Sequence, residues 1–218
     1  MDELSLVQRI VVWILPILFA ITVHEVAHGW AAKKLGDNTA YSQGRLTLNP
    51  LKHLELFGSV LLPGLLLLTG TGFIFGWAKP IPVEPRYFKR PLRDMAIVAA
   101  AGPLSNILMA IAWALIARLG VMVGTSLEAV SLPLIYMGSA GIAINLGLAV
   151  INLLPIPPLD GSRIVTALLP IRLAIQYNQL ERFGFVILIV LLYTRVLNTL
   201  IAYPLYIAQK LFFAIAGL

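Results

Sequence analysis

The sequence lacks cysteine and has little charge. With no cysteine in 218 residues, disulfide bonds and thiolate zinc sites are excluded. Charged residues make up 12% of the chain and hydrophobic residues 59%, whereas a soluble domain carries about 25% charged residues. The composition therefore predicts a polytopic membrane protein, with about four to six helices at roughly 20 residues per span.

The charge that is present is basic. A net charge of +6 is typical of loops that lie beside an anionic cytosolic leaflet. A nucleic-acid partner is not expected, because the sequence has no basic, aromatic-laced soluble face. No repeat, low-complexity tract or internal linker interrupts the chain, so residues 1–218 are predicted to form a single membrane-embedded domain.

Histidine is scarce as well, and two of the three histidines stand in one H-E-x-x-H motif within residues 22–29. On a helix, His24 and His28 project from one face, one turn apart, and can hold one zinc ion. Glu25 can reach a water molecule as a general base. The alternative is a pair of core histidines with chance spacing, which is disfavoured because ionisable groups inside a membrane are costly and usually functional.

A third zinc ligand has to come from elsewhere, and Asp160 is the best candidate. It follows an apolar span rich in small residues and a rigid proline run, where a carboxylate can turn back into the bundle. Asp2, Asp37 and Asp94 lie in polar stretches without such support. A His-His-carboxylate set leaves the fourth position of zinc for water, as a catalytic site requires.

The expected fold is an all-α membrane bundle with a short extended or β segment. Alternation predicts a short strand at 45–48, and prolines favour an extended segment from Lys79 to Pro85. Residues 119–133 are expected to be an outside loop and 162–182 an interfacial helix. Residues 204–218 are expected to be a short half-span or an interfacial helix. Full spans are predicted over 10–32, 95–117, 134–154 and 183–203.

Loop charges predict the topology. Residues 76–94 are assigned to the cytosol, because they contain Lys79, Arg86, Lys89, Arg90 and Arg93. Asp160 follows a span that runs inward, so the first span must also end on the cytosolic side if its histidines are to meet Asp160. Residues 58–75 should therefore enter and return as a re-entrant hairpin, turning near 63–64 or 70–72. The alternative is an ordinary span, which separates the ligands unless the metal lies near mid-membrane.

Three motifs occur in a fixed order within the predicted spans. They are His24-Glu25-Val26-Ala27-His28, then Gly102-Pro103-Leu104-Ser105-Asn106, then Asn152 through Leu159-Asp160-Gly161. In this order the chain resembles the site-2 proteases, which are intramembrane zinc metallopeptidases. It is similar to their short prokaryotic branch without a PDZ domain, also in residues 44–50 and 77–80. Glu55-Leu56 stands where an acidic-proline pair is expected, so the roles of His53 and Glu55 stay open.

The resemblance implies one Zn²⁺ per chain, bound by His24, His28 and Asp160, with Glu25 as the base. It also implies that Asn152 and Asn106 help to bind the scissile carbonyl or its oxyanion, since an amide can donate to a developing oxyanion. The alternative role for both asparagines is interhelical hydrogen bonding.

The implied protein is a multi-pass endopeptidase of the prokaryotic plasma membrane. It would cleave transmembrane protein substrates within the bilayer, with the active site near the cytosolic side. A membrane-bound metal transporter, an inactive scaffold, and a zinc peptidase acting on soluble peptides at the membrane surface are the alternatives. Neither the substrate's identity nor the oligomeric state is indicated by the sequence.

Overall fold

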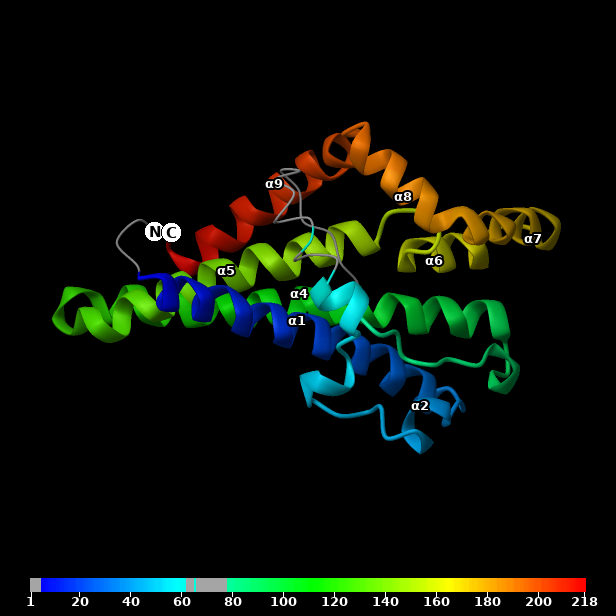
Figure 1. Cartoon of the computed structure of the whole chain (residues 1–218), viewed down its shortest axis with the longest axis horizontal. Coiled ribbons are helices and arrows are strands. Elements are labelled where there is room, and N and C mark those ends of the chain that lie inside the picture. The colour runs from blue at the N-terminus through cyan, green and yellow to red at the C-terminus, as the bar shows by residue number, and fades with distance from the viewer. Residues whose placement is uncertain (1–4, 62–64, 66–77) are drawn as a thin grey trace.

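The structure is a computed structural model that describes residues 5–61, 65 and 78–218 (Figure 1). Within these residues the secondary structure is helical and contains no strand, which confirms the all-α class. The principal helices are α1 (Leu6–Lys34), α2 (Thr39–Ser42), α4 (Pro91–Val123), α5 (Glu128–Asn152), α6 (Asp160–Leu168), α7 (Ile171–Asn178), α8 (Gly184–Tyr193) and α9 (Val196–Ala216). The shorter turns are η1 (Pro50–Lys52), η2 (Leu56–Leu61), η3 (Pro85–Tyr87), η4 (Gly124–Leu127) and η5 (Gln179–Phe183).

Several of these helices are long and apolar enough to cross a membrane. The described part of the chain contains 5 such segments, within the range predicted from composition. They are Ile10–Lys34, Pro91–Val123, Glu128–Asn152, Ile171–Tyr193 and Val196–Ala216. The chain is therefore a multi-pass membrane protein.

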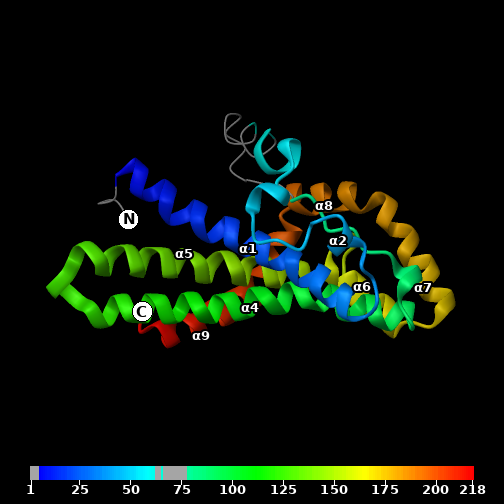
Figure 2. The same cartoon turned by 90° about the horizontal axis from the view of Figure 1, so that it is seen from below.

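Helices α1, α4 and α5 lie side by side and form the centre of the bundle (Figures 1 and 2). Helices α1 and α5 run in the same direction and α4 runs the opposite way. At about 1.5 Å per residue, the 33 residues of α4 extend for about 50 Å, beyond the roughly 30 Å of a hydrocarbon core. Because α4 runs opposite to α1 and α5, the C-terminal ends of α1 and α5 lie beside the N-terminal half of α4. Helix α6 also packs against α4.

At the opposite end, the core lies between α4, α5 and α9. Trp113 and Ala117 of α4, Ile142 of α5 and Phe212 of α9 belong to one buried cluster. Gly141 allows the close approach, because a Cβ there would lie 2.6 Å from Trp113 Cδ1. Small residues on α5 thus bring the two central helices together, as is common in membrane bundles.

Two predicted boundaries are wrong. The expected outside loop over 119–133 is mostly helical, because α4 continues to Val123 and α5 begins at Glu128. An absence of basic residues marks a side of the membrane and does not end a helix. The helix ends instead at Gly124, whose φ of 62° is accessible to glycine at little cost.

The last predicted span, 183–203, is also wrong. Helix α8 ends at Tyr193, Arg195 adopts a left-handed conformation with φ 60°, and α9 begins at Val196. The expected half-span over 204–218 is therefore part of a full-length helix. Hydropathy predicts one continuous apolar span here, because it contains no information on the backbone conformation of a single residue. The expected interfacial helix over 162–182 is likewise divided into α6, α7 and η5, and its second half belongs to the candidate span Ile171–Tyr193.

The expected strand at 45–48 is wrong as well. The Arg45 N–H donates to the Ala40 carbonyl in a turn, so this segment bonds locally and forms no ladder. The predicted extended segment, Lys79 to Pro85, contains no helix up to Glu84, which has φ −112° and ψ 100°, and Pro85 begins η3. The predicted re-entrant hairpin over 58–75 falls largely outside the described residues and stays a prediction; its described beginning, 58–61, belongs to η2.

Candidate metal centre

His24 and His28 lie one turn apart in the C-terminal half of α1. Their Nε2 atoms are 3.0 Å apart. The two rings meet edge to face, with centroids 4.6 Å apart and an interplanar angle of 89°. The helical spacing of the motif therefore brings the two Nε2 atoms to one point, as the sequence predicts.

Asp160, the first residue of α6, completes the candidate metal group, which consists of His24, His28 and Asp160. Its Oδ2 lies 3.4 Å from each of the two histidine Nε2 atoms. This oxygen is buried and has no hydrogen-bond partner among the described residues. Gly161 makes the approach possible, because a Cβ there would lie 2.5 Å from the Leu153 carbonyl carbon at the end of α5.

The three atoms form a triangle with sides of 3.0, 3.4 and 3.4 Å. In a tetrahedral zinc site with metal–ligand distances of about 2.0–2.2 Å, neighbouring ligand atoms lie about 3.3–3.6 Å apart. The triangle therefore fits one face of such a tetrahedron and leaves the fourth vertex open. Within the described residues, this is the one group of three or more acidic, histidine or cysteine side chains with metal-binding spacing.

Each histidine ring is held through its other nitrogen. His28 Nδ1 lies 2.8 Å from the Val98 carbonyl oxygen, and His24 Nδ1 lies 2.6 Å from Asn106 Oδ1. Both partners are acceptors, so each Nδ1 carries the hydrogen and donates it. Each Nε2 then keeps its lone pair toward the triangle, which is how metal-binding histidines are usually oriented.

The Asp160 carboxyl is ready to bind a cation at neutral pH. In the metal-free site a ring that carries a hydrogen on Nε2 can donate it to this carboxylate. Burial raises the pKa of Asp160, but hydrogen bonds and positive charge from the His24 and His28 rings outweigh burial and lower the pKa to about 2. An ionised carboxylate is the form that coordinates a metal.

Gly102 brings α4 against both rings. A Cβ on Gly102 would lie 2.5 Å from His28 Cε1 and 2.6 Å from His24 Cε1, and it would also overlap His28 Nε2. A glycine is therefore needed at this position of the second motif, because the backbone of α4 packs directly against the two histidine rings.

The two asparagines lie in different surroundings. Asn106 is completely buried, and its amide N–H groups donate to the Ala20 carbonyl and to Asn145 Oδ1. This leaves Asn106 no amide hydrogen for a substrate carbonyl, which differs from the role that the resemblance implies. Asn152 is half-buried at the end of α5 and donates one N–H to the Leu148 carbonyl of its own helix at 3.0 Å.

Glu25 contacts the extended segment 78–84. Its Oε2 accepts a hydrogen bond of 2.9 Å from the Ile81 N–H. Ile81 is itself buried and lies beside Gly29, where a Cβ would lie 3.0 Å from Ile81 Cδ1. The half-buried Glu25 carboxylate of α1 is thus held by a backbone N–H of segment 78–84.

The polar connector after α1 anchors this segment at both ends. The Lys79 N–H donates to the His53 carbonyl at 2.9 Å, and Arg45 Nη2 donates to the Lys79 carbonyl at 2.9 Å. Asp37 Oδ2 accepts from the Glu84 N–H at 2.7 Å. The His53 side chain is fully buried and Nε2 lies 2.8 Å from a backbone carbonyl, so this histidine supports the connector and is not in the metal group.

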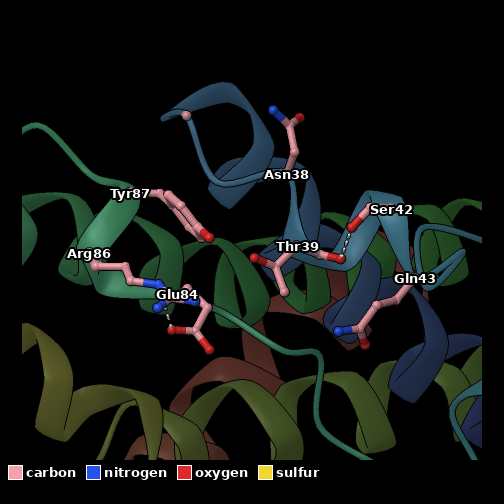
Figure 3. A pocket seen from close by; sticks show the side chains of 8 residues that line it. Asn38, Thr39, Ser42, Gln43, Glu84, Arg86 and Tyr87 are labelled. Atoms are coloured by element: carbon pink, nitrogen blue, oxygen red, sulfur yellow. Dashed lines mark hydrogen bonds and ion pairs between the residues drawn. The ribbon is translucent and has the colours of Figure 1, made fainter.

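A polar cavity of about 450 Å³ lies beyond the end of α1 (Figure 3). It shares no residue with the metal group. Two interactions lie at its wall. Arg86 and Glu84 form an exposed ion pair, and the Ser42 hydroxyl donates to the Thr39 carbonyl. Its full lining is Gly36, Asn38, Thr39, Ser42, Gln43, Glu84, Arg86 and Tyr87.

A helical membrane bundle with a His-His-carboxylate group, an open fourth position and an adjacent glutamate defines the class of zinc-dependent hydrolases. The sequence profile described as peptidase family M50 matches residues 119–194. That range contains Asn152 and Asp160, and it does not include the H-E-x-x-H motif.

Curated relatives extend the match to most of the chain. It is 42% identical over 182 residues to "Putative zinc metalloprotease YwhC" of Bacillus subtilis, covering 83% of this chain and 80% of that protein. It is 32% identical over 186 residues to "Putative zinc metalloprotease Rip2" of Mycolicibacterium smegmatis, covering 83% of this chain and 66% of that protein. A comparison with solved structures found no match. The chain belongs to peptidase family M50, the site-2 protease family, and is a zinc metalloprotease.

Proposed function

We propose that this protein is an intramembrane endopeptidase that hydrolyses peptide bonds of transmembrane substrate helices. His24, His28 and Asp160 would be the ligands of one Zn²⁺ and Glu25 the general base. The observation that carries the proposal is the triangle with sides of 3.0, 3.4 and 3.4 Å, formed by two histidines inside a candidate membrane span and by Asp160 just after another.

The reaction adds one water across a peptide bond. A zinc ion at this site supplies Lewis acidity, which polarises the scissile carbonyl and acidifies water. The Glu25 carboxylate takes a proton as the water oxygen bonds to the carbonyl carbon. It then gives that proton to the amine nitrogen as the carbon–nitrogen bond breaks. Asn152, whose amide has a second N–H besides the one bound to Leu148, is proposed to donate to the carbonyl oxygen.

The substrate has to be extended to react, because a helix hides its carbonyls in hydrogen bonds. Segment 78–84 offers a template for such an extended chain. Pro80 and Pro82 remove the N–H groups from one edge, while Ile81 and Val83, two residues apart, present theirs on the other. A substrate strand that pairs with this edge by β-augmentation would replace Glu25 on the Ile81 N–H. Substrate binding would then free the carboxylate for its role as base.

Charge and helix direction support a cytosolic location for the site. Helices α1 and α5 end at the same end of the bundle, beside α6 (Figures 1 and 2), and Asp160, the first residue of α6, lies 3.4 Å from both histidines of α1. Lys33, Lys34, Lys89 and Arg90 lie at that end too, at the end of α1 and just before α4, and basic residues favour the cytosolic side. We place the protein in a prokaryotic plasma membrane, with residues 1–218 acting as one membrane-embedded peptidase domain.

The test compares Glu25→Gln with wild type on two substrates of the same cleavage sequence, one a transmembrane segment in proteoliposomes and one a soluble peptide. Glu25→Gln should bind zinc as wild type does and lose cleavage by about 100-fold or more, the scale of a missing general base. Glu128→Gln, at the exposed start of α5 at the far end of the bundle, is the matched control. Retained cleavage by Glu25→Gln would remove its role as base, and equal cleavage of the soluble peptide would favour action at the membrane surface.

A further inference from the structure

Two asparagines are completely buried in the middle of the bundle, where apolar side chains are the rule. Asn106 of α4 and Asn145 of α5 both have no exposed surface. Leaving such amides unpaired in an apolar setting is strongly unfavourable. Their hydrogen bonds therefore need to be accounted for one by one.

The bonds form a chain that leads from α5 to a metal-binding ring. Asn145 Nδ2 donates to the Gly141 carbonyl at 2.9 Å, and Asn145 Oδ1 accepts from Asn106 Nδ2 at 2.9 Å. Asn106 Nδ2 also donates to the Ala20 carbonyl at 3.2 Å, and Asn106 Oδ1 faces His24 Nδ1 at 2.6 Å. One side chain of α4 thus joins the central helices and ends on His24.

The direction of each bond is fixed by backbone carbonyls. A carbonyl only accepts, so the atom of Asn106 that faces Ala20 and the atom of Asn145 that faces Gly141 must be amide nitrogens. It follows that Asn106 presents its oxygen to His24, and that His24 carries its hydrogen on Nδ1. The nitrogen with the lone pair is then Nε2, the atom that faces Asp160 at 3.4 Å.

The two histidines differ in what holds them. His28 Nδ1 donates to the Val98 carbonyl, which is part of a helix backbone and cannot turn. His24 Nδ1 donates to a side-chain amide, which can rotate and present its NH₂ group instead. That rotation would make Nδ1 an acceptor and put the hydrogen on Nε2, where it would block metal binding. His24 therefore depends on whatever prevents Asn106 from rotating.

We propose that Asn145 is a positioning residue for the metal site. By accepting one N–H of Asn106, it adds a shorter bond to the one that Asn106 donates to the Ala20 carbonyl, and so strengthens the amide orientation that keeps His24 in its metal-binding tautomer. This inference rests on the zinc site proposed above and extends it to a residue that touches neither metal nor substrate. Residues that orient metal ligands typically contribute about 10–100-fold to metal affinity.

The first measurement is the zinc dissociation constant of the purified, detergent-solubilised protein, by competition with a chelator. Asn145→Ala and Asn145→Ser should bind zinc about 10–100-fold more weakly than wild type. The serine hydroxyl, one heavy atom shorter, still bonds the Gly141 carbonyl in the way that Ser139 bonds Ile135 at 2.7 Å, so Asn145→Ser loses only the link to Asn106. It also carries the test if Asn145→Ala does not fold. Ser139→Ala, which removes an own-helix bond from α5, is the control and should match wild type.

The second measurement distinguishes positioning from packing. With only three histidines in the chain, ¹⁵N NMR of histidine-labelled, zinc-free protein can assign each ring by single substitution. Wild type should show His24 as the Nδ1–H tautomer, and Asn145→Ser should shift it toward Nε2–H while His28 stays unchanged. In the Asn106→Leu background, Asn145→Ser should cause no further loss of zinc affinity, because the chain of bonds is already broken.

His24→Ala separates the two levels of the proposal. If His24→Ala binds zinc like wild type, the zinc site itself is wrong. If His24→Ala loses zinc but Asn145→Ser and Asn145→Ala keep wild-type affinity, the site stands and the role of Asn145 is overturned. Weaker zinc binding with an unchanged His24 tautomer, or losses that add in the double variant, would also overturn it, since both indicate packing.

Discussion

A single methyl group on Gly102 offers the sharpest test of the site, because it changes no ligand and no charge. Gly102 is on α4 and faces the His24 and His28 rings, the two proposed histidine ligands. In Gly102→Ala the new Cβ would lie 2.5 Å from His28 Cε1 and 2.6 Å from His24 Cε1. Carbon atoms pack best at about 3.5–4.0 Å, so the rings or the helix would have to move by about 1 Å.

That displacement is large on the scale of metal coordination. Ligand distances in functional metal sites fall within about 0.2 Å of their usual values. A shift of about 1 Å in His24 and His28 therefore removes at least one nitrogen from the tetrahedral face. We expect zinc affinity to fall by about 100-fold or more, the upper range for disturbing the groups that orient the ligands, and peptide cleavage to fall with it.

The assay measures bound zinc per chain and the zinc dissociation constant in detergent, together with helix content. Gly147→Ala on α5 is the matched control, because nothing lies within 4 Å of its added Cβ. Alanine favours a helix over glycine by about 1 kcal/mol, so neither variant should weaken its helix. Wild-type zinc affinity in Gly102→Ala would refute the reasoning, since it would mean that the rings do not need this wall to bind metal.

Further predictions concern the third ligand, the extended segment and acid stability. Asp160→Ala should lower bound zinc in metal analysis, and unchanged zinc would rule out its role as ligand. Arg45→Lys should reduce substrate cleavage and leave zinc content unchanged, because it weakens the bond to the Lys79 carbonyl at 2.9 Å without touching the metal group. Burial raises the pKa of Asp37. Hydrogen bonds from the Glu84 and Thr39 N–H groups and from the Thr39 hydroxyl lower this pKa by more than burial raises it, so the net shift is downward. Asp37 then stabilises the fold above the unfolded pKa of about 3.9, and this contribution is lost as pH falls through the lowered folded value. Thermal unfolding followed from about pH 6 to about pH 3 should show this loss in wild type and less of it in Asp37→Asn.

Spacing along one helix was enough to predict half of the metal group. His24 and His28 follow from the period of the α-helix, which acts over four residues and needs no tertiary information. Asp160 required a topological argument, and the structure brings its carboxylate to 3.4 Å from both rings. The coarse fold was predictable for a similar reason, because apolar length alone determines which segments can span a bilayer.

Features that depend on how helices are rotated against one another could not be predicted in this way. Asn145 appears in the sequence as one polar residue in an apolar span, and its partner is 39 positions away. The sequence around Arg45 predicts an alternating strand, whereas the Arg45 side chain donates to the backbone carbonyl of Lys79, 34 positions away. The break at Arg195 depends on one left-handed residue, to which hydropathy is blind.

The second motif gains a physical meaning from the first. On α4, Val98, Gly102 and Asn106 recur every four residues and so lie along one face. The first anchors His28, the second lies against both rings, and the third anchors His24. Because α4 runs opposite to α1, the earlier residue of α4 meets the later histidine of α1. The four-residue spacing in Gly-Pro-Leu-Ser-Asn therefore matches that in His-Glu-Val-Ala-His, since two antiparallel helices of the same period face each other across the metal group.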